Sequence, residues 1–235
     1  MPYKEITRGA GKRMMEEILI GTLSVEILYS FIIVICSLMI FFGTKELYKL
    51  SGHKGIKYFR LAFLYFAIAY FFRSFIKIII VCFGMDGFRS FGFLFGAASS
   101  FLFMYFSIMA IFYLLYSVLY KKLKRDYIKV FHVGLLVLTF VVIGFGNNIK
   151  LILLANILLL LFIVYIVYLA YMQSKKKKSL NLYIVYFLLS IFWMLNIIDI
   201  LIPDFLRAFQ LLIYLMSLGV FLVILYKVLT RAGVN

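Results

Sequence analysis

LILLANILLLLFIVYIVYLAYM at residues 151–172 precedes QSKKKKS at 173–179, and LNLYIVYFLLSIFWMLNIIDILI follows at 180–202. An α-helix needs about 20 residues to cross a hydrocarbon core that is about 30 Å thick. Both apolar runs meet that length, and the four lysines between them mark a short polar connection. This stretch therefore predicts two antiparallel membrane-spanning helices joined at one membrane surface.

The same alternation of apolar runs and short polar gaps extends along the chain of 235 residues. Hydrophobic residues make up 66% of it and the mean hydropathy is +1.10, far above the values of water-soluble domains. Pro2 and Pro203 are its two prolines, and neither lies inside an apolar run. We expect an all-α polytopic membrane protein, a bundle of seven transmembrane helices at 24–42, 61–83, 91–119, 127–146, 151–172, 180–202 and 205–229.

Basic residues are concentrated in alternate gaps between these spans. Sixteen lysines and arginines lie in the gaps after spans one, three and five and in the tail after span seven, whereas the other three gaps hold Arg89, Lys150 and Arg207. Lysine and arginine accumulate in cytoplasmic loops. The asymmetry therefore predicts a multi-pass protein of the cell (plasma) membrane with its N-terminus outside and its C-terminus in the cytoplasm.

The first 23 residues depart from this pattern, because they carry positive charge on the side that should face outward. Four basic residues lie there: Lys4, Arg8, Lys12 and Arg13. Either residues 1–23 form an amphipathic helix on the membrane surface, or they are not native and translation starts at Met14 or Met15. We expect a single transmembrane domain at 24–230 and a short cytoplasmic tail at 231–235.

Polar side chains inside the spans are the first place to look for function, because a charge in the bilayer is costly. Arg73 and Lys77 lie four residues apart on one helix face, and Arg73 lies roughly 12–15 Å below the outer boundary. Polar groups from five spans reach a similar depth. The candidate ligand-pocket residues are Glu26, Arg73, Lys77, Asn156, Trp193, Asn196, Asp199 and Gln210.

Two arrangements of these residues remain open. In the first, an outward-facing pocket uses Arg73 and Lys77 to recognise an anionic or carbonyl-bearing ligand, which Asn196 and Asp199 orient. In the second, Arg73 and Asp199 form a structural ion pair, and the Lys77 side chain snorkels to the lipid head groups. The two arrangements are compatible, since a pocket can contain an ion pair.

The predicted inner loops carry dense positive charge. They should bind the anionic head groups of the bilayer, and an acidic cytoplasmic protein partner is the alternative. The residues concerned are Lys121, Lys122, Lys124, Arg125, Lys175, Lys176, Lys177 and Lys178.

Several functional classes are disfavoured. The net charge of +16 lies in short loops at helix ends, so nucleic-acid binding is not expected. Span seven has no lysine in its middle, which argues against retinal. Cysteines and histidines show no metal-ligand spacing, and no catalytic set of residues is recognisable, so we expect no metal, no cofactor and no enzymatic activity.

Residues 48–51 read YKLS, and residues 57–64 read KYFRLAFL, a basic loop leading into an aromatic-rich second span. Together with seven spans and an N-out, C-in topology, this resembles the seven-helix sensor modules of prokaryotic signalling proteins. In that group the module precedes a histidine kinase or cyclase domain, and here the sequence ends at Asn235. The resemblance implies a stand-alone module that signals through a separate partner. The composition, rich in Ile, Lys and Phe, is typical of an AT-rich prokaryotic genome such as an archaeal one.

Three functions therefore remain in view. The first is a receptor-like module that senses an external or membrane-dissolved ligand. The second is a non-catalytic subunit or scaffold of a membrane complex, and the third is a small transporter or channel that uses the layer of Arg73, Lys77 and Asp199.

Overall fold

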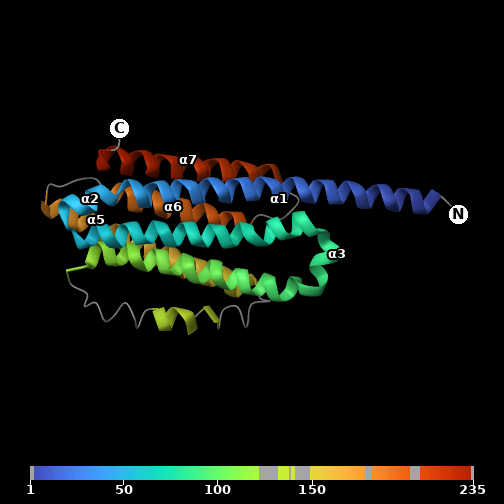
Figure 1. The fold of residues 1–235 in the computed structure, drawn as a ribbon, viewed down its shortest axis with the longest axis horizontal. Coiled ribbons are helices and arrows are strands. Elements are labelled where there is room, and N and C mark those ends of the chain that lie inside the picture. The colour runs from blue at the N-terminus through green and yellow to red at the C-terminus, as the bar shows by residue number, and fades with distance from the viewer. Residues whose placement is uncertain are drawn as a thin grey trace.

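A computed structural model describes residues 3–121, 132–137, 139–140, 149–177, 182–201 and 207–233. Within these ranges the regular structure is helical throughout, as the apolar runs predict. The labelled helices are α1 (Tyr3–Gly43), α2 (Lys45–Ser51), α3 (Lys54–Leu119), α5 (Ile149–Lys177), α6 (Leu182–Leu201) and α7 (Arg207–Ala232). They lie side by side along one long axis (Figure 1).

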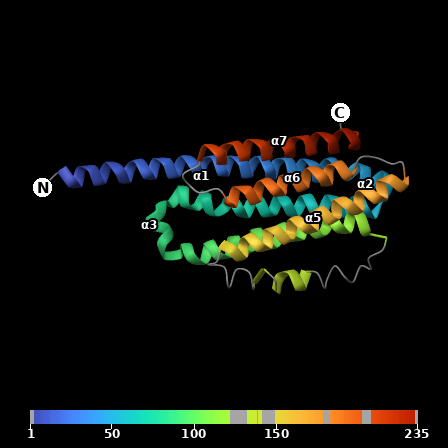
Figure 2. The ribbon, with the colours of Figure 1, turned by 180° about the vertical axis from the view of Figure 1, so that it is seen from behind.

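Helix α3 turns back on itself at the end of the molecule opposite α2, as Figures 1 and 2 show from two sides. Its first arm, Lys54–Ile79, therefore lies antiparallel to its second arm, Phe101–Leu119. Stacked rings join the arms, for example Tyr65 with Tyr113 at 4.9 Å and Phe72 with Phe106 at 5.8 Å between centroids. The two arms correspond to the second and third predicted spans, and the residues between them remain helical within α3.

Four segments of the described chain are long and apolar enough to cross a membrane: Leu23–Ser51, Lys54–Ile79, Phe101–Leu119 and Phe209–Thr230. Two shorter apolar helices, Asn156–Met172 and Tyr183–Asp199, lie within α5 and α6. These six segments overlap six of the predicted spans. The predicted span at 127–146 falls mostly outside the described residues. The parts of it that the structure describes, 132–137 and 139–140, are helical.

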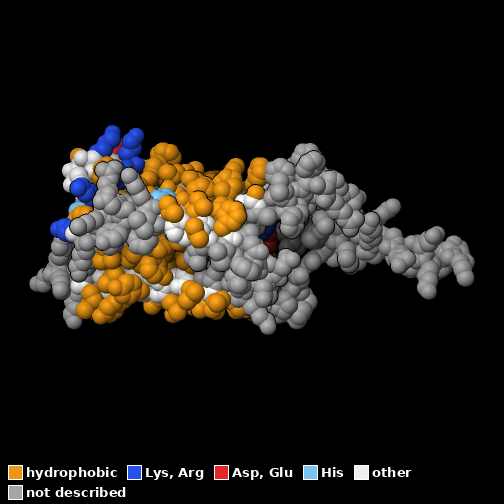
Figure 3. All heavy atoms as spheres, turned by 90° about the horizontal axis from the view of Figure 1, so that it is seen from below, with side chains coloured by type: hydrophobic (Ala, Val, Ile, Leu, Met, Phe, Trp, Pro, Cys, Tyr) orange, Lys and Arg blue, Asp and Glu red, His pale blue; other side chains and the backbone are white. Residues whose placement is uncertain are grey.

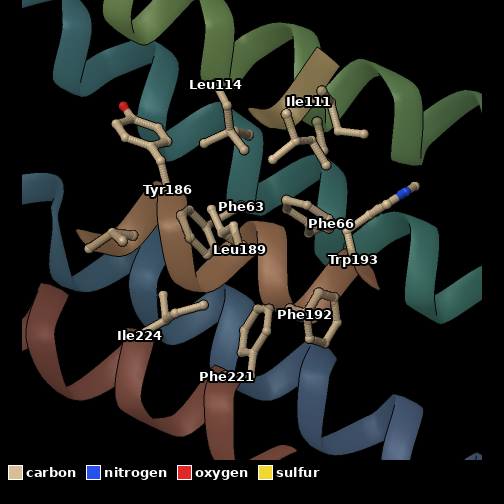
Figure 4. Packing of buried hydrophobic residues seen from close by; sticks show 14 of the residues in the cluster. Phe63, Phe66, Ile111, Leu114, Tyr186, Leu189, Phe192, Trp193, Phe221 and Ile224 are labelled. Carbon is tan, nitrogen blue, oxygen red and sulfur yellow. The ribbon is translucent and has the colours of Figure 1, made fainter. Parts of the chain in front are cut away.

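The core lies where α1, both arms of α3, α6 and α7 meet. Helix α1 packs against α3 and α7, and α6 packs against α5 and α7. Large aromatic side chains fill the centre, and Figure 4 shows Phe63 and Phe66 of α3 close to Phe192 of α6 and Phe221 of α7. Fully buried Phe63, Phe192 and Phe221 are in ring contact.

The described part of the face in Figure 3 is largely apolar away from the end where α2 lies. Every long helix exposes large apolar side chains, among them Leu28, Phe31, Leu161, Met194 and Leu215. A continuous apolar surface of this kind is stable in lipid, whereas a soluble monomer rarely exposes one. We therefore describe the protein as a helical membrane protein.

Exposed lysines gather at one end of the bundle, where α2 lies, and we call this the basic end (Figure 3). Its residues are Lys45, Lys49, Lys54, Lys57 and Lys121. Gly52 ends α2 in the left-handed conformation with φ 59°, which glycine adopts without strain, and its N–H donates to the Tyr48 carbonyl. Arg60 Nε donates to the Phe41 carbonyl at 3.0 Å and so satisfies the end of α1.

Two segments that lie outside the predicted spans continue neighbouring helices in the structure. Residues 3–23 belong to the same helix as the first predicted span, and α1 extends past the rest of the bundle at its N-terminal end (Figure 1). Lys175, Lys176 and Lys177 were expected in a loop, but they form the last turn of α5. Positive charge there is favourable, because the carbonyl end of a helix carries partial negative charge.

Candidate functional site

The first arm of α3 presents Tyr70, Arg73 and Lys77 at intervals of three and four residues, which places them on one helix face. Arg73 lies about 28 Å from Lys54 along the helix, at a rise of 1.5 Å per residue. These three side chains therefore lie deep in the bundle and far from the basic end.

Arg73 links α3 to α6 through two hydrogen bonds. Its NH1 group donates to Asn196 Oδ1 at 3.1 Å, and its NH2 group donates to Asp199 Oδ2 at 3.2 Å, which is also an ion pair. Tyr70 OH donates to the same Asn196 oxygen at 3.0 Å. Asn196 is held in turn by its own amide, which donates to the Phe192 carbonyl at 2.8 Å.

The second carboxylate oxygen of Asp199 accepts a hydrogen bond from α7, and further hydrogen bonds connect α7 to α1. Gln210 Nε2 donates to Asp199 Oδ1 at 3.2 Å and to Tyr214 OH at 3.0 Å. Tyr214 OH donates to Glu26 Oε1 at 2.7 Å, and Glu26 Oε2 forms an ion pair with Lys77 Nζ. The chain of contacts thus leaves α3 at Arg73, passes through α6, α7 and α1, and returns to α3 at Lys77.

Aromatic rings enclose the Arg73 guanidinium. Its central carbon lies 5.9 Å from the Tyr29 ring, 5.6 Å from the Tyr70 ring and 5.7 Å from the Phe103 ring, within the range of cation–π attraction. Tyr29 also stacks on Tyr214 at 4.8 Å, and its hydroxyl lies 2.9 Å from Ser217 Oγ. Tyr29 is thereby fixed between α3 and α7.

We call the residues joined in this way the polar layer. They are Glu26, Tyr29, Tyr70, Arg73, Lys77, Asn196, Asp199, Gln210, Tyr214 and Ser217. Its two cations and two carboxylates balance in charge, which lowers the cost of holding them inside a membrane. Side-chain exposure is 17% for Arg73 against 8% for Asp199, and 20% for Lys77 against 14% for Glu26.

The surface opens near the middle of the face in Figure 3, where basic and acidic side chains are visible inside a recess. The apolar surface of the bundle borders the recess on the side toward the basic end. Charged groups are therefore accessible from outside the bundle at that point.

The structure brings together six of the eight predicted pocket residues: Glu26, Arg73, Lys77, Asn196, Asp199 and Gln210. It contains the ion pair of Arg73 and Asp199. Lys77, for which snorkelling was one expectation, pairs with Glu26 instead, because α1 places a carboxylate within its reach. Asn156 is half-buried on α5.

Trp193 is buried in the aromatic core, one turn before Asn196 on α6. Its Nε1 atom has no hydrogen-bond partner among the described residues. Figure 4 shows its ring directed away from Phe192 and Phe221. The tryptophan therefore adjoins the polar layer without being bonded to it.

Four residues of the polar layer were not predicted: Tyr29, Tyr70, Tyr214 and Ser217. A signal for the three tyrosines is present in the sequence, since each lies well inside a predicted span. A tyrosine at that depth needs a hydrogen-bond partner for its hydroxyl, whereas one at the membrane boundary can reach water.

The predicted basic docking residues are only partly described. Lys121 is exposed at the basic end, with its Nζ atom 5.9 Å from the Tyr120 ring. The backbone of Lys175, Lys176 and Lys177 is helical, and Lys122, Lys124, Arg125 and Lys178 lie outside the described residues.

A second polar contact lies between the second arm of α3 and the helical residues 132–137. The Tyr105 hydroxyl is 2.8 Å from His132 Nδ1, and the Tyr113 hydroxyl is 3.3 Å from His132 Nε2. Both ring nitrogens are thus bonded to tyrosines. In the part of the chain that the structure describes, no group of three or more His, Cys, Asp or Glu residues could hold a metal ion.

Comparison with known proteins finds similarity to an archaeal protein. The chain is 28% identical to a protein of Archaeoglobus fulgidus, named only as an uncharacterized protein, over 223 residues that cover 89% of this chain and 93% of the relative. No family model matches the chain, and no solved structure matches it. The similarity extends over nearly the full length of both proteins, as expected if the relative shares the whole bundle.

Proposed function

We propose that this chain is a receptor-like membrane module, related to the seven-helix sensor modules of prokaryotic signalling proteins, that binds a ligand at the polar layer. In this proposal it has seven spans, with the N-terminus outside and the basic end in the cytoplasm. Six apolar segments, and helical residues inside the predicted span at 127–146, support the count. The collection of exposed lysines at one end supports the orientation.

The observation that carries the proposal is the continuous bonding of the polar layer through four helices. Arg73 and Lys77 on one helix are joined to α6, α7 and α1 by directed hydrogen bonds and ion pairs. A ligand that bonds to Arg73 or Lys77 acts at a point where four helices are joined. Binding at this level therefore changes the free energy of the helix arrangement.

Signalling in this scheme ends at the opposite end of the bundle. Helices α1, α3 and α7, which carry much of the polar layer, also reach the basic end, where Lys121 is exposed. A shift of these helices relative to one another would alter the surface that a separate cytoplasmic partner contacts. The four lysines Lys175, Lys176, Lys177 and Lys178 are the proposed site of that contact.

A test measures whether the two ends are coupled. Spin labels at Lys49→Cys and Lys227→Cys, in a chain whose Cys36 and Cys82 are replaced by alanine, report the separation of α2 and α7 in lipid nanodiscs. We expect Asp199→Asn, which weakens the link of α6 to Arg73 and α7, to change the distance distribution. The exposed substitution Lys54→Gln, on the same side as the labels, is the control for a simple change in charge.

The other functions predict different results. Unchanged distances, together with co-purification of a partner in fixed stoichiometry, would favour a scaffold subunit and contradict the receptor proposal. Flux of small anions into proteoliposomes that is lost in Asp199→Asn would instead favour a transporter.

A further inference from the structure

Arg73 and Lys77 have more N–H donors than the polar layer provides described contacts for. A guanidinium has five N–H donors, and the described contacts of Arg73 use two, one to Asn196 and one to Asp199. The three remaining donors have no acceptor among the described residues. Its ring contacts do not satisfy them, because those contacts act through the face of the guanidinium.

Lys77, one turn further along the same helix face, also has more donors than described contacts. Its ammonium has three donors, and its described contact is the ion pair with Glu26. Meanwhile every carboxylate oxygen of the polar layer is already engaged, Asp199 by Arg73 and Gln210 and Glu26 by Tyr214 and Lys77. The layer therefore has five charged donors without a described acceptor, and the oxygens of an incoming group can accept hydrogen bonds from them.

The accessible atoms belong mainly to the cations. In each ion pair the basic side chain is more exposed than its carboxylate, at 17% against 8% for Arg73 with Asp199 and 20% against 14% for Lys77 with Glu26. Charged side chains are visible inside the recess of Figure 3. Both cationic side chains are therefore accessible to a group that approaches from outside.

We propose that Arg73 and Lys77 bind the oxygens of a singly charged oxyanion, a carboxylate or a phosphodiester, through these unmatched donors. The inference rests on the proposed ligand site at the polar layer and names the chemistry of its ligand. A carboxylate and a phosphodiester each offer two oxygens that match the forked donors of a planar guanidinium. A single charge fits best, because the layer is neutral and each added negative charge is left without a counter-ion.

A phosphodiester head group of a lipid and a free carboxylate would present the same oxygens. Both sources are tested on the full chain in a non-ionic detergent by following its thermal unfolding midpoint, which rises with any ligand that binds the folded state. One arm compares acetate with chloride at equal ionic strength and with acetamide, its uncharged isostere. The other arm compares dihexanoyl phosphatidylglycerol with dihexanoylglycerol, which lacks the phosphodiester.

We expect a saturable rise of the midpoint with acetate or with the phospholipid, and none with the uncharged analogue. In the double variant Lys77→Gln, Glu26→Gln, which removes one donor set while keeping the layer neutral, the half-saturating concentration should rise about tenfold, the effect of losing charge-assisted hydrogen bonds. Lys57→Gln, on the same helix at the basic end, should leave it unchanged. Sulfate should bind more weakly than acetate.

Equal responses to acetate and acetamide, and to both lipid analogues, would overturn the proposal and leave water as the partner of these donors. An unchanged response in the double variant would overturn the assignment to Lys77. A response in one arm alone identifies the source of the oxyanion. Specific oxyanion binding without any change in the spin-label distances would contradict the receptor function but retain the ligand site.

Discussion

Arg73 contacts one carboxylate, one amide and three aromatic rings through a single side chain. Its bonds to Asn196 and Asp199 tie α3 to α6, two helices that are otherwise bridged by long side chains. Lysine cannot replace it, because an ammonium lacks the planar fork that reaches both acceptors at once. The sequence indicated this pair through the depth and opposite signs of its two residues.

Removing either Arg73 or Asp199 alone should lower the free energy of unfolding more than removing both charges together. Arg73→Gln leaves the buried Asp199 carboxylate without its counter-ion, so we expect a loss of about 3–5 kcal/mol in the free energy of unfolding. The double variant Arg73→Gln, Asp199→Asn keeps hydrogen bonding without charge and should be more stable than either single variant. Unfolding curves in detergent, arranged as a double-mutant cycle, measure the coupling, and strictly additive losses would contradict the pair.

Other residues of the polar layer could be predicted only in part. Lys77 could be placed by helix geometry, but its partner Glu26 is 51 positions away, and no local pattern specifies that α1 packs beside α3. Tyr70 and Tyr214 have the composition of packing residues, and their hydrogen bonds depend on the rotation of each helix. Similarly, the position of His132 between Tyr105 and Tyr113 follows from tertiary contacts.

Among the helices, the two arms of α3 come close together at Gly55 near the basic end. A Cβ atom built on Gly55 would lie 2.8 Å from the Ser117 carbonyl oxygen, a backbone atom that cannot move aside as a flexible side chain does. The absence of a side chain at this position is therefore needed for the arms to be this close.

Gly55→Ala should separate the arms and destabilise the protein. We expect a loss of about 1–3 kcal/mol, typical of overpacking in a close-packed interior. Gly219→Ala on α7 is the matched control, since a Cβ there meets no atom within 4 Å and alanine is the better helix former. Thermal unfolding of both variants measures the difference. Equal stability of the two would show that the close contact of the arms at Gly55 can accommodate a methyl group.

The length of the helices was less predictable than their existence. Apolar periodicity and span length predict where α5, α6 and α7 lie, because lipid requires about 20 apolar residues for a crossing. The positions at which the helices end depend on other factors, namely helix propensity and the charge near each helix end. Lys175, Lys176 and Lys177 continue α5 beyond its apolar run, since lysine is a good helix former and favours the carbonyl end.

On the scale of the whole molecule, the ends of α1 and α7 lie with the start of α3 and the end of its second arm at the basic end. This arrangement is the one that the alternating charge requires. Its direction in the membrane is open to a direct test by chemical labelling.

Single cysteines introduced into a chain without Cys36 and Cys82 should report the topology. We expect a membrane-impermeant maleimide applied to intact cells to label Arg89→Cys, in a predicted outer gap, and to label Ser51→Cys and Lys121→Cys only after permeabilisation. Labelling of all three in intact cells, or the reverse pattern, would contradict the N-out, C-in orientation.

Trp193 is the one tryptophan of the chain, and it lies one turn from Asn196 with its indole N–H unmatched among the described residues. Its fluorescence therefore arises from a single interior position beside the ionised groups. Emission should be characteristic of an indole shielded from water, and occupancy or protonation of nearby groups should change its intensity. The unlabelled protein thus carries an optical reporter by which binding, unfolding and exchange between helix arrangements can be followed in real time.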